Sequence, residues 1–273
     1  MGIRLKGQTA IITGGARGQG AAEARRFADE GAFVVITDLL DREGEDLATE
    51  IGSAATFKHL DVTNQEAWDE LIRNILDERG SIDVLVNNAG MHSRGNLEAV
   101  SPEDVGAMVD VNIRAPLMLS CAAIPFMRRA GGGGIVMVGS LAGMAPLQGA
   151  ATYSGTKAGL RAFAYALADE MRGTGIHVGV VSPGPIDTGF IMDEIDLVED
   201  IVFSQPMSTA KQVADAIIEL AAEDTVEISM PAFSGKLTTL SYLFPSLRRL
   251  SRGTLNKIGR KNKEKYRARN KGG

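Results

Sequence analysis

Short runs of apolar, mostly β-branched residues recur along the chain, and helical patterns lie between them. Each run predicts a buried strand, and each intervening stretch with apolar residues three or four positions apart predicts an amphipathic helix. The strands are expected at 8–13, 33–37, 55–59, 84–86, 135–139 and 177–181. The helices are expected after the first strand (through Phe27 and Ala28), at 42–51, 65–79, 101–111 and 114–130, and around Tyr153.

This regular alternation predicts parallel βαβ units with right-handed crossovers. We therefore expect an α/β fold: a single-domain, Rossmann-type, doubly wound parallel sheet of about seven strands with helices on both faces. The chain of 273 residues is long enough for such a domain and shows no internal linker or repeat. We expect a cofactor-binding catalytic unit over 1–236, with a substrate lid at about 186–206, and an apolar then basic extension over 237–273.

A glycine-rich turn joins the first expected strand to the first helix. Gly14, Gly18 and Gly20 stand where the chain must turn tightly and where helix amides can approach a pyrophosphate. In isolation such a motif is as often a plain turn. The strand before it and the helix after it favour dinucleotide binding.

An acidic residue follows the second expected strand and bears on the choice of cofactor. Asp38 lies 18 residues beyond Gly20, close to the spacing at which a carboxylate accepts hydrogen bonds from an adenosine ribose. It would also repel a 2′-phosphate, which favours NAD over NADP. Arg17 supports the alternative, because its guanidinium could pair with that phosphate. Leu39, rather than a basic residue, follows Asp38, so we expect NAD.

The central motif of the chain pairs a tyrosine with a lysine. Tyr153 and Lys157 are four residues apart in a strongly helical run, so their side chains share one face. The adjacent ammonium is expected to lower the phenol pKa toward a range useful for proton transfer. Ser140, at the end of an apolar strand, offers a hydroxyl that could hold a substrate oxygen beside the phenol.

Together these residues resemble the single-domain branch of the short-chain dehydrogenase/reductase family, and in part its NAD-linked bacterial hydroxysteroid dehydrogenases. The resemblance covers roughly residues 5–230 and implies hydride transfer between NAD(H) and a secondary alcohol or ketone. It implies that Tyr153 is the general acid or base, that Lys157 assists it, that Ser140 orients the substrate and that Asn112 supports a water relay. The family motifs in order are Thr13-Gly14-x-x-x-Gly18-x-Gly20, Asp61-Val62, Asn87-Asn88-Ala89-Gly90, Asn112, Ser140, Tyr153-x-x-x-Lys157 and Pro183-Gly184.

The resemblance also implies a set of cofactor contacts at the carboxyl ends of the strands. Gln19 departs from it, because an aliphatic residue is usual between the last two glycines of the turn. The expected contacts are Gly14, Arg17, Gly18, Gln19, Gly20, Asp38, Leu39, Asp61, Val62, Asn88, Ala89, Gly90, Tyr153, Lys157, Pro183, Gly184, Ile186 and Thr188.

The expected lid interleaves apolar residues with Asp and Glu, which suggests a lipophilic substrate such as a hydroxysteroid. The alternative is that its apolar residues only pack the lid onto the core, since apolar spacing on helices normally means burial. The expected substrate contacts are Ser140, Met144, Leu147, Tyr153, Phe190 and Met192, with Met91 and His92 nearby. An NADP-dependent ketoreductase using Arg17 and a non-catalytic NAD-binding sensor or scaffold remain the alternative functions.

Composition and charge narrow the remaining choices. The net charge of −5 divides into about −15 for the body and +10 for residues 248–273, and the acidic body argues against nucleic-acid binding. Three dispersed His and one Cys form no metal-ligand pattern, and Cys121 is expected to be a small buried side chain. Without an apolar leader, a cytoplasmic protein is expected.

The extension has two interpretations. Its apolar segment at 237–250 and the basic residues that follow could dock peripherally on an anionic membrane. Alternatively, the apolar segment packs on the subunit or a neighbour, and the basic end is disordered. The family resemblance further implies a homodimer or homotetramer formed through the helix at 114–130 and the Tyr153 helix.

Overall fold

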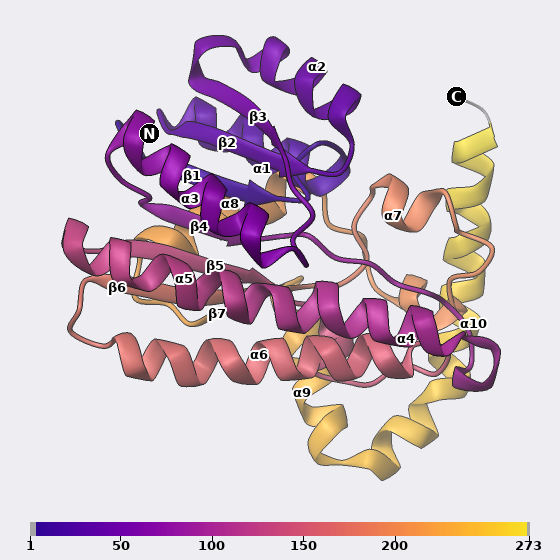
Figure 1. Ribbon diagram of the computed structural model, residues 1–273. Helices are drawn as coiled ribbons and strands as arrows, with labels where there is room; N and C mark the ends of the chain where they lie inside the picture. The colour runs from indigo at the N-terminus through magenta and orange to yellow at the C-terminus, as the bar shows by residue number, and fades with distance from the viewer. Residues whose placement is uncertain (1–3, 272–273) are drawn as a thin grey trace.

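A computed structural model describes residues 4–271, so the first three residues of the predicted catalytic unit and the last two of the extension lie outside it. Its centre is a seven-stranded parallel sheet in the order β3-β2-β1-β4-β5-β6-β7 (Figure 1). The predicted doubly wound α/β fold is confirmed. The strands are β1 (Thr9–Thr13), β2 (Phe33–Asp38), β3 (Ala55–His59), β4 (Val84–Asn87), β5 (Gly133–Val138), β6 (Ile176–Pro183) and β7 (Glu227–Met230).

Helices cover both faces of the sheet. One face carries α1 (Gly18–Asp29), α2 (Asp41–Ile51) and α8 (Ala210–Ala222). The other carries α3 (Gln65–Arg79), α5 (Ala115–Ala130) and α6 (Ala151–Met171). The remaining helices are α4 (Pro102–Val109), α7 (Gly189–Met192), α9 (Ala232–Leu243) and α10 (Pro245–Lys271).

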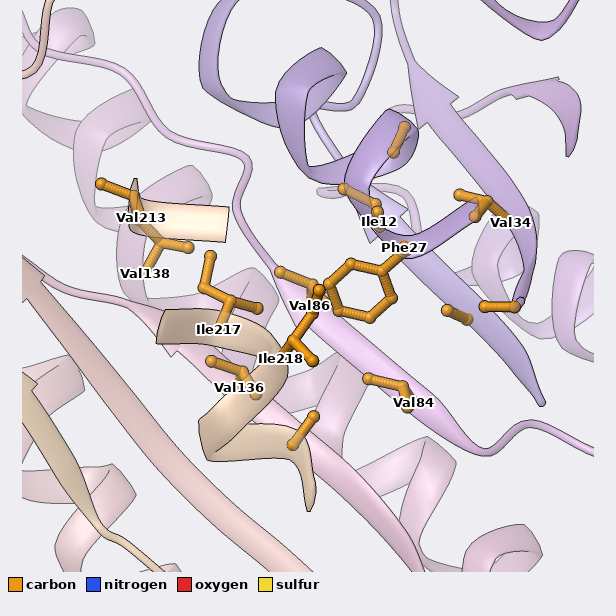
Figure 2. Close-up of a cluster of buried hydrophobic side chains, with 14 of the residues drawn as sticks. Ile12, Phe27, Val34, Val84, Val86, Val136, Val138, Val213, Ile217 and Ile218 are labelled. Atoms are coloured by element: carbon orange, nitrogen blue, oxygen red, sulfur yellow. The ribbon is translucent and has the colours of Figure 1, made fainter. Parts of the chain in front are cut away.

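The alternation of side chains along each strand divides the core into two layers. In β1, Ile12 packs toward α1 and α8, whereas Ile11 packs toward the opposite layer. Figure 2 shows the first layer, in which Phe27 of α1 and Ile217 of α8 meet valines of the central strands. Burial on both faces explains why the strands read as continuous apolar runs.

The two helices predicted at 101–111 and 114–130 form one helix with a wide turn at Asp110–Arg114. By length and composition alone this helix could cross a membrane. It instead lies on the sheet, where Leu119, Ala123 and Met127 are part of the core. Cys121 on the same helix is exposed, so its predicted burial is wrong: it faces away from the layer that buries those three residues.

The basic residues up to Lys271 form a helix, contrary to the disordered alternative. α10 runs from Pro245 to Lys271 and packs along the 186–206 segment (Figure 1). The boundary predicted at 236/237 falls inside α9. Acidic residues of the 186–206 segment, described below, give this basic helix its partners.

A buried carboxyl group in α1 makes the stability of the fold pH-dependent. Glu23 is completely buried, and burial raises its pKa from 4.5 to about 8, although a hydrogen bond from Gln19 at 2.8 Å opposes the shift. The unusual Gln19 of the glycine turn therefore has a structural partner. Because the folded-state pKa of Glu23 lies above its unfolded value, the effect of this group on stability is most favourable below about pH 4.5 and becomes less favourable as pH rises toward 8.

We expect Glu23→Gln to remove this pH dependence, because the amide is neutral at every pH and still accepts from Gln19. The free energy of unfolding should rise by roughly 3 to 5 kcal/mol at pH 8 and change little at pH 4.5. Urea unfolding at both pH values measures this, with exposed Glu45→Gln as the control. An equal effect of Glu23→Gln at the two pH values would contradict the assignment.

Candidate active site

The loop after β1 is tied to the loop after β4 by side-chain hydrogen bonds. The Asn88 amide donates to the carbonyl oxygens of Thr13 and Gly14, both at 2.9 Å, and the Thr13 hydroxyl accepts from the backbone of Asn88 and Ala89 at 3.1 Å. Gly14 has φ +62°, and a Cβ there would lie 2.8 Å from the Cα of Ala89. The predicted glycine turn and the Asn88 loop therefore meet at the carboxyl edge of the sheet.

Two glycines keep the start of α1 open. Gly18 has φ +56°, and a Cβ on it would face Thr188 at 3.8 Å. A Cβ on Gly20 would lie 2.2 Å from the Gly14 carbonyl oxygen, so only glycine allows this approach. Residues from both halves of the sheet thus border the N-terminus of α1, where a pyrophosphate would be favoured.

Asp38 stands at the end of β2, beside this turn. One carboxylate oxygen accepts from the backbone of Ala16 at 3.0 Å, and the other accepts from Leu39 at 2.8 Å and Leu40 at 3.2 Å. The carboxylate therefore holds the glycine turn and remains at the sheet edge. Arg17 and Leu39 are both exposed.

The other predicted cofactor residues also lie along the carboxyl edge. Asp61, after β3, accepts from the backbone and hydroxyl of Thr63, while Val62 packs against the core. Pro183 ends β6, and the Gly184 amide donates to the Met230 carbonyl oxygen at 2.7 Å. Ile186 is buried and bridges to Ser208.

Ser140, Tyr153 and Lys157 come together where β5 ends and α6 begins. The buried Nζ of Lys157 donates to the Val138 carbonyl oxygen at 2.8 Å and lies 5.7 Å from the Tyr153 ring centre. Ser140 is hydrogen-bonded to Tyr153 and also accepts from Ala142 at 3.1 Å. A seryl hydroxyl and a phenol thus sit side by side next to a buried ammonium.

In this structure burial, and not Lys157, has the largest effect on the pKa of Tyr153. Burial raises the pKa of Tyr153, while the hydrogen bond with Ser140 and the charge of Arg94 lower it only in part. Burial also lowers the pKa of Lys157 to about 8, because its charged form loses water. The expectation of a phenol pKa lowered by Lys157 is therefore wrong for this structure, in which the cation that lowers it is Arg94.

Asn112 lies in the wide turn between α4 and α5 and is completely buried. Its amide group binds the backbone of Met91 through both ends, at 2.8 Å each, and reaches the Thr156 hydroxyl at 3.3 Å. A Cβ on Gly90 would lie 3.3 Å from Asn112 Oδ1 and 3.6 Å from Lys157 Nζ. Asn112 therefore holds the loop beside Lys157, and its predicted role in a water relay stays a prediction.

Sequence reasoning missed Arg94, which lies in the loop after β4. Its guanidinium donates to Glu194 and to the Phe190 carbonyl oxygen, both at 2.8 Å, and contacts His92 Nδ1 at 3.0 Å. His92 in turn stacks on Tyr153. The available signal was charge alone. The segment 186–206 contains six acidic residues and no basic one, so a basic residue such as Arg94 was a candidate partner.

Comparison with known proteins agrees with this geometry. The family model for short chain dehydrogenase matches residues 8–196. The chain belongs to this family. It is an oxidoreductase by family, and the family binds a nicotinamide cofactor.

Two enzymes and one solved structure illustrate its place among short-chain dehydrogenases. The chain is 41% identical over 191 residues to 2,5-dichloro-2,5-cyclohexadiene-1,4-diol dehydrogenase of Sphingobium indicum, covering 69% of this chain and 76% of that one. It is 32% identical to 3-alpha-(or 20-beta)-hydroxysteroid dehydrogenase of Mycobacterium tuberculosis, over 82% of this chain and 86% of that enzyme. The 3-ketoacyl-(acyl-carrier-protein) reductase of Brucella melitensis, complexed with NADH, superposes with a TM-score of 0.77 at 28% identity, covering 84% and 99%.

The 186–206 segment of this short-chain dehydrogenase, here called the lid, has a small core of its own. Met192 is buried there with Ile195, Val198 and Phe203, whereas Phe190 is exposed. Met144 is buried and accepts a hydrogen bond from Ser229, and the Leu147 backbone donates to Ser154. Most apolar lid residues therefore pack within the lid, which supports the packing alternative for Met192.

α10 braces the lid through ionic and polar contacts. Lys263 is buried and donates to the carbonyl oxygens of Asp196 at 3.3 Å and Val198 at 2.5 Å. Its Nζ also forms an ion pair with the Asp200 carboxylate at 3.5 Å. A Cβ on Gly259 would lie 1.8 Å from the Asp200 carbonyl oxygen, so the helix backbone presses against the lid. The outer ion pairs are Arg260 with Asp200, Arg267 with Asp196 and Arg269 with Asp187.

We expect Lys263→Met to loosen the lid while leaving the sheet intact, because it removes the one buried cation of this brace among the described residues. Hydrogen bonds to a charged group contribute about 1.5 to 3 kcal/mol, so amide exchange across 186–206 should accelerate at least about tenfold. Hydrogen-exchange mass spectrometry measures this. Lys261→Met, exposed on the same helix, should leave lid exchange as in the wild type, and equal acceleration in both variants would refute the brace.

Proposed function

We propose that the protein is an NAD-dependent short-chain alcohol dehydrogenase or ketoreductase that acts on a lipophilic secondary alcohol or ketone. The observation that carries this proposal is the grouping of Ser140, Tyr153 and Lys157 at the carboxyl end of β5, beside the glycine turn. A hydroxyl hydrogen-bonded to a phenol, with a buried ammonium 5.7 Å from the centre of the phenol ring, is suited to moving one proton to or from a substrate oxygen.

The residues present fit a nicotinamide dinucleotide. The glycine turn leaves the N-terminus of α1 free of side chains at Gly18 and Gly20, and the Asp38 carboxylate beside this turn would be the acceptor for a ribose. Gly14, Asn88, Gly90, Ile186 and Thr188 would border the rest of the group. When bound, the cofactor would supply or accept the hydride, while the protein fixes distance and charge.

In this proposal the chain itself provides orientation and the proton. Ser140 holds the substrate oxygen, and Tyr153 donates its proton in ketone reduction or accepts one in alcohol oxidation. The raised pKa of Tyr153 keeps the phenol protonated at neutral pH, which suits the donor role. Lys157 binds the nicotinamide ribose and keeps a positive charge near the oxygen where negative charge develops.

Asp38 supports NAD as the cofactor, because a carboxylate at the ribose position would repel a 2′-phosphate. Exposed Arg17 keeps an NADP-dependent ketoreductase as the alternative. A non-catalytic NAD-binding sensor is less well supported, since binding alone needs no Ser140–Tyr153 pair beside a buried lysine.

We further propose a cytoplasmic homodimer or homotetramer, for which exposed Val109 and Met118 offer apolar surface on the α4–α5 helix.

The test is turnover of a panel of hydroxysteroids and other lipophilic secondary alcohols, each with NAD and with NADP. We expect NAD-linked turnover, and we expect Tyr153→Phe to lower kcat at least about 100-fold, because general acid–base catalysis contributes that much. Tyr165→Phe, a matched loss of a hydroxyl farther along α6, is the control. NADP-linked turnover would favour Arg17 over Asp38, and full activity of Tyr153→Phe would refute the catalytic assignment.

We also propose that α9 is the part of the chain that touches a membrane surface. Phe233, Leu243 and Phe244 are 77%, 65% and 56% exposed on and just after this helix. The basic residues of α10 are less available, because Arg260, Lys263, Arg267 and Arg269 bind the lid. These exposed apolar side chains, with exposed Lys236 on the same helix, are the feature that supports docking on an anionic membrane.

We expect the full chain to co-sediment with vesicles containing anionic phospholipid, and the combined Phe233→Ser, Leu243→Ser and Phe244→Ser variant to lose most of that binding. Removing three large apolar groups removes the insertion energy while the brace on the lid stays in place. Leu97→Ser, at an exposed apolar residue elsewhere, is the control. Failure of the wild type to sediment would end the membrane proposal.

A further inference from the structure

His92 shares the active site with the phenol of Tyr153. It follows Met91, whose backbone is held by Asn112, and its ring lies 4.3 Å from the Tyr153 ring with an angle of 15° between the planes. This is an offset-parallel stack of an imidazole on the proposed acid–base residue. The imidazole therefore lies next to the position of the reacting substrate oxygen.

The contact with Arg94 determines which imidazole nitrogen carries the hydrogen. Arg94 Nη1 lies 3.0 Å from His92 Nδ1, and a guanidinium has only donors. Nδ1 must therefore accept, and in the neutral ring the hydrogen is on Nε2. Burial and the charges of Arg94 and Lys157 lower the pKa of His92 to about 3, so the ring stays neutral at physiological pH.

The Nε2–H group has no partner within the described chain. Nε2 is shielded from solvent, and no acceptor of residues 4–271 lies within hydrogen-bonding distance. Leaving a buried donor unpaired is unfavourable, so a native structure that keeps one calls for an explanation. Stacking on Tyr153 alone would need neither this donor nor an arginine that orients it.

We propose that His92 is a specificity-determining residue whose Nε2–H donates to a second oxygen of the substrate, close to the carbon that reacts. This inference rests on the proposed function and narrows it: the substrate class is an alcohol or ketone with a further hydroxyl or carbonyl oxygen, as in a diol or hydroxyketone. Tyr153 and Ser140 hold the reacting oxygen, and His92 holds the other.

Arg94 is the positioning residue for this contact. Its side chain is only 10% exposed, and the guanidinium that selects the His92 tautomer also binds Glu194 and the Phe190 carbonyl oxygen of the lid. The side chain that orients the donor on His92 is therefore itself held by two contacts with the lid. Arg94 thus links the group proposed to bind the second oxygen to the 186–206 segment.

The test compares cyclohexanol with cyclohexane-1,2-diol and cyclohexane-1,4-diol on the full-length protein with NAD. We expect the wild type to prefer at least one diol in kcat/KM by about tenfold or more, the usual effect of one hydrogen bond to a buried donor. His92→Phe keeps an aromatic ring on Tyr153 and should abolish the preference. His92→Gln keeps an N–H donor and should retain part of it, while His177→Phe, at the opposite edge of the sheet, should keep all of it.

A second measurement does not depend on turnover. With isotope-labelled histidine in the NADH-bound Tyr153→Phe protein, the Nε2 resonance of His92 should shift on addition of a diol and much less on addition of cyclohexanol. The signal is assigned by its loss in a Tyr153→Phe, His92→Phe double variant. Equal shifts with diol and cyclohexanol, or no shift with either, would overturn the role of His92. Absence of turnover throughout would instead count against the proposed function.

Discussion

The buried ammonium of Lys157 is the constraint on which the arrangement of the candidate active site depends. A charge removed from water must find partners, and the Nζ finds the Val138 carbonyl oxygen at the end of β5. This contact holds the start of α6 against the sheet edge. Gly143 makes it possible, because a Cβ there would lie 2.6 Å from the carbonyl carbon of Lys157. Ser140 and Tyr153 flank the contact, so they face each other.

The fold and the glycine turn could be predicted because their signals are local. The β-branched runs around Ile12 and Val35 are buried on both faces of the sheet. Strands buried in this way are almost entirely apolar, so their composition predicts their burial. The glycine turn was recognisable for a similar reason. At Gly14 and Gly20 another part of the backbone comes so close that a Cβ would collide with it, so only glycine fits there. A residue whose role follows from its neighbours in sequence can be interpreted from sequence.

The surroundings of the tyrosine could not be predicted in this way. The helical spacing of Tyr153 and Lys157 was correct, but the phenol pKa depends on burial and on Arg94, which comes from a different loop. The pairing of Arg94 with Glu194 spans 100 residues and depends on how the lid folds. The docking of α10 had only a charge signal: a basic segment in a chain with an acidic lid. Opposite charges indicate attraction without specifying geometry.

The brace between α10 and the lid has a consequence for the conditions in which this enzyme works. Its outer ion pairs, such as Arg269 with Asp187, are partly exposed, and exposed charges are screened over about 8 Å at physiological ionic strength. Salt does not screen the apolar contacts that hold the sheet and its helices together. Rising salt therefore weakens the hold of α10 on the 186–206 segment before it weakens the fold, so ionic strength becomes a control on how firmly this segment is kept in place.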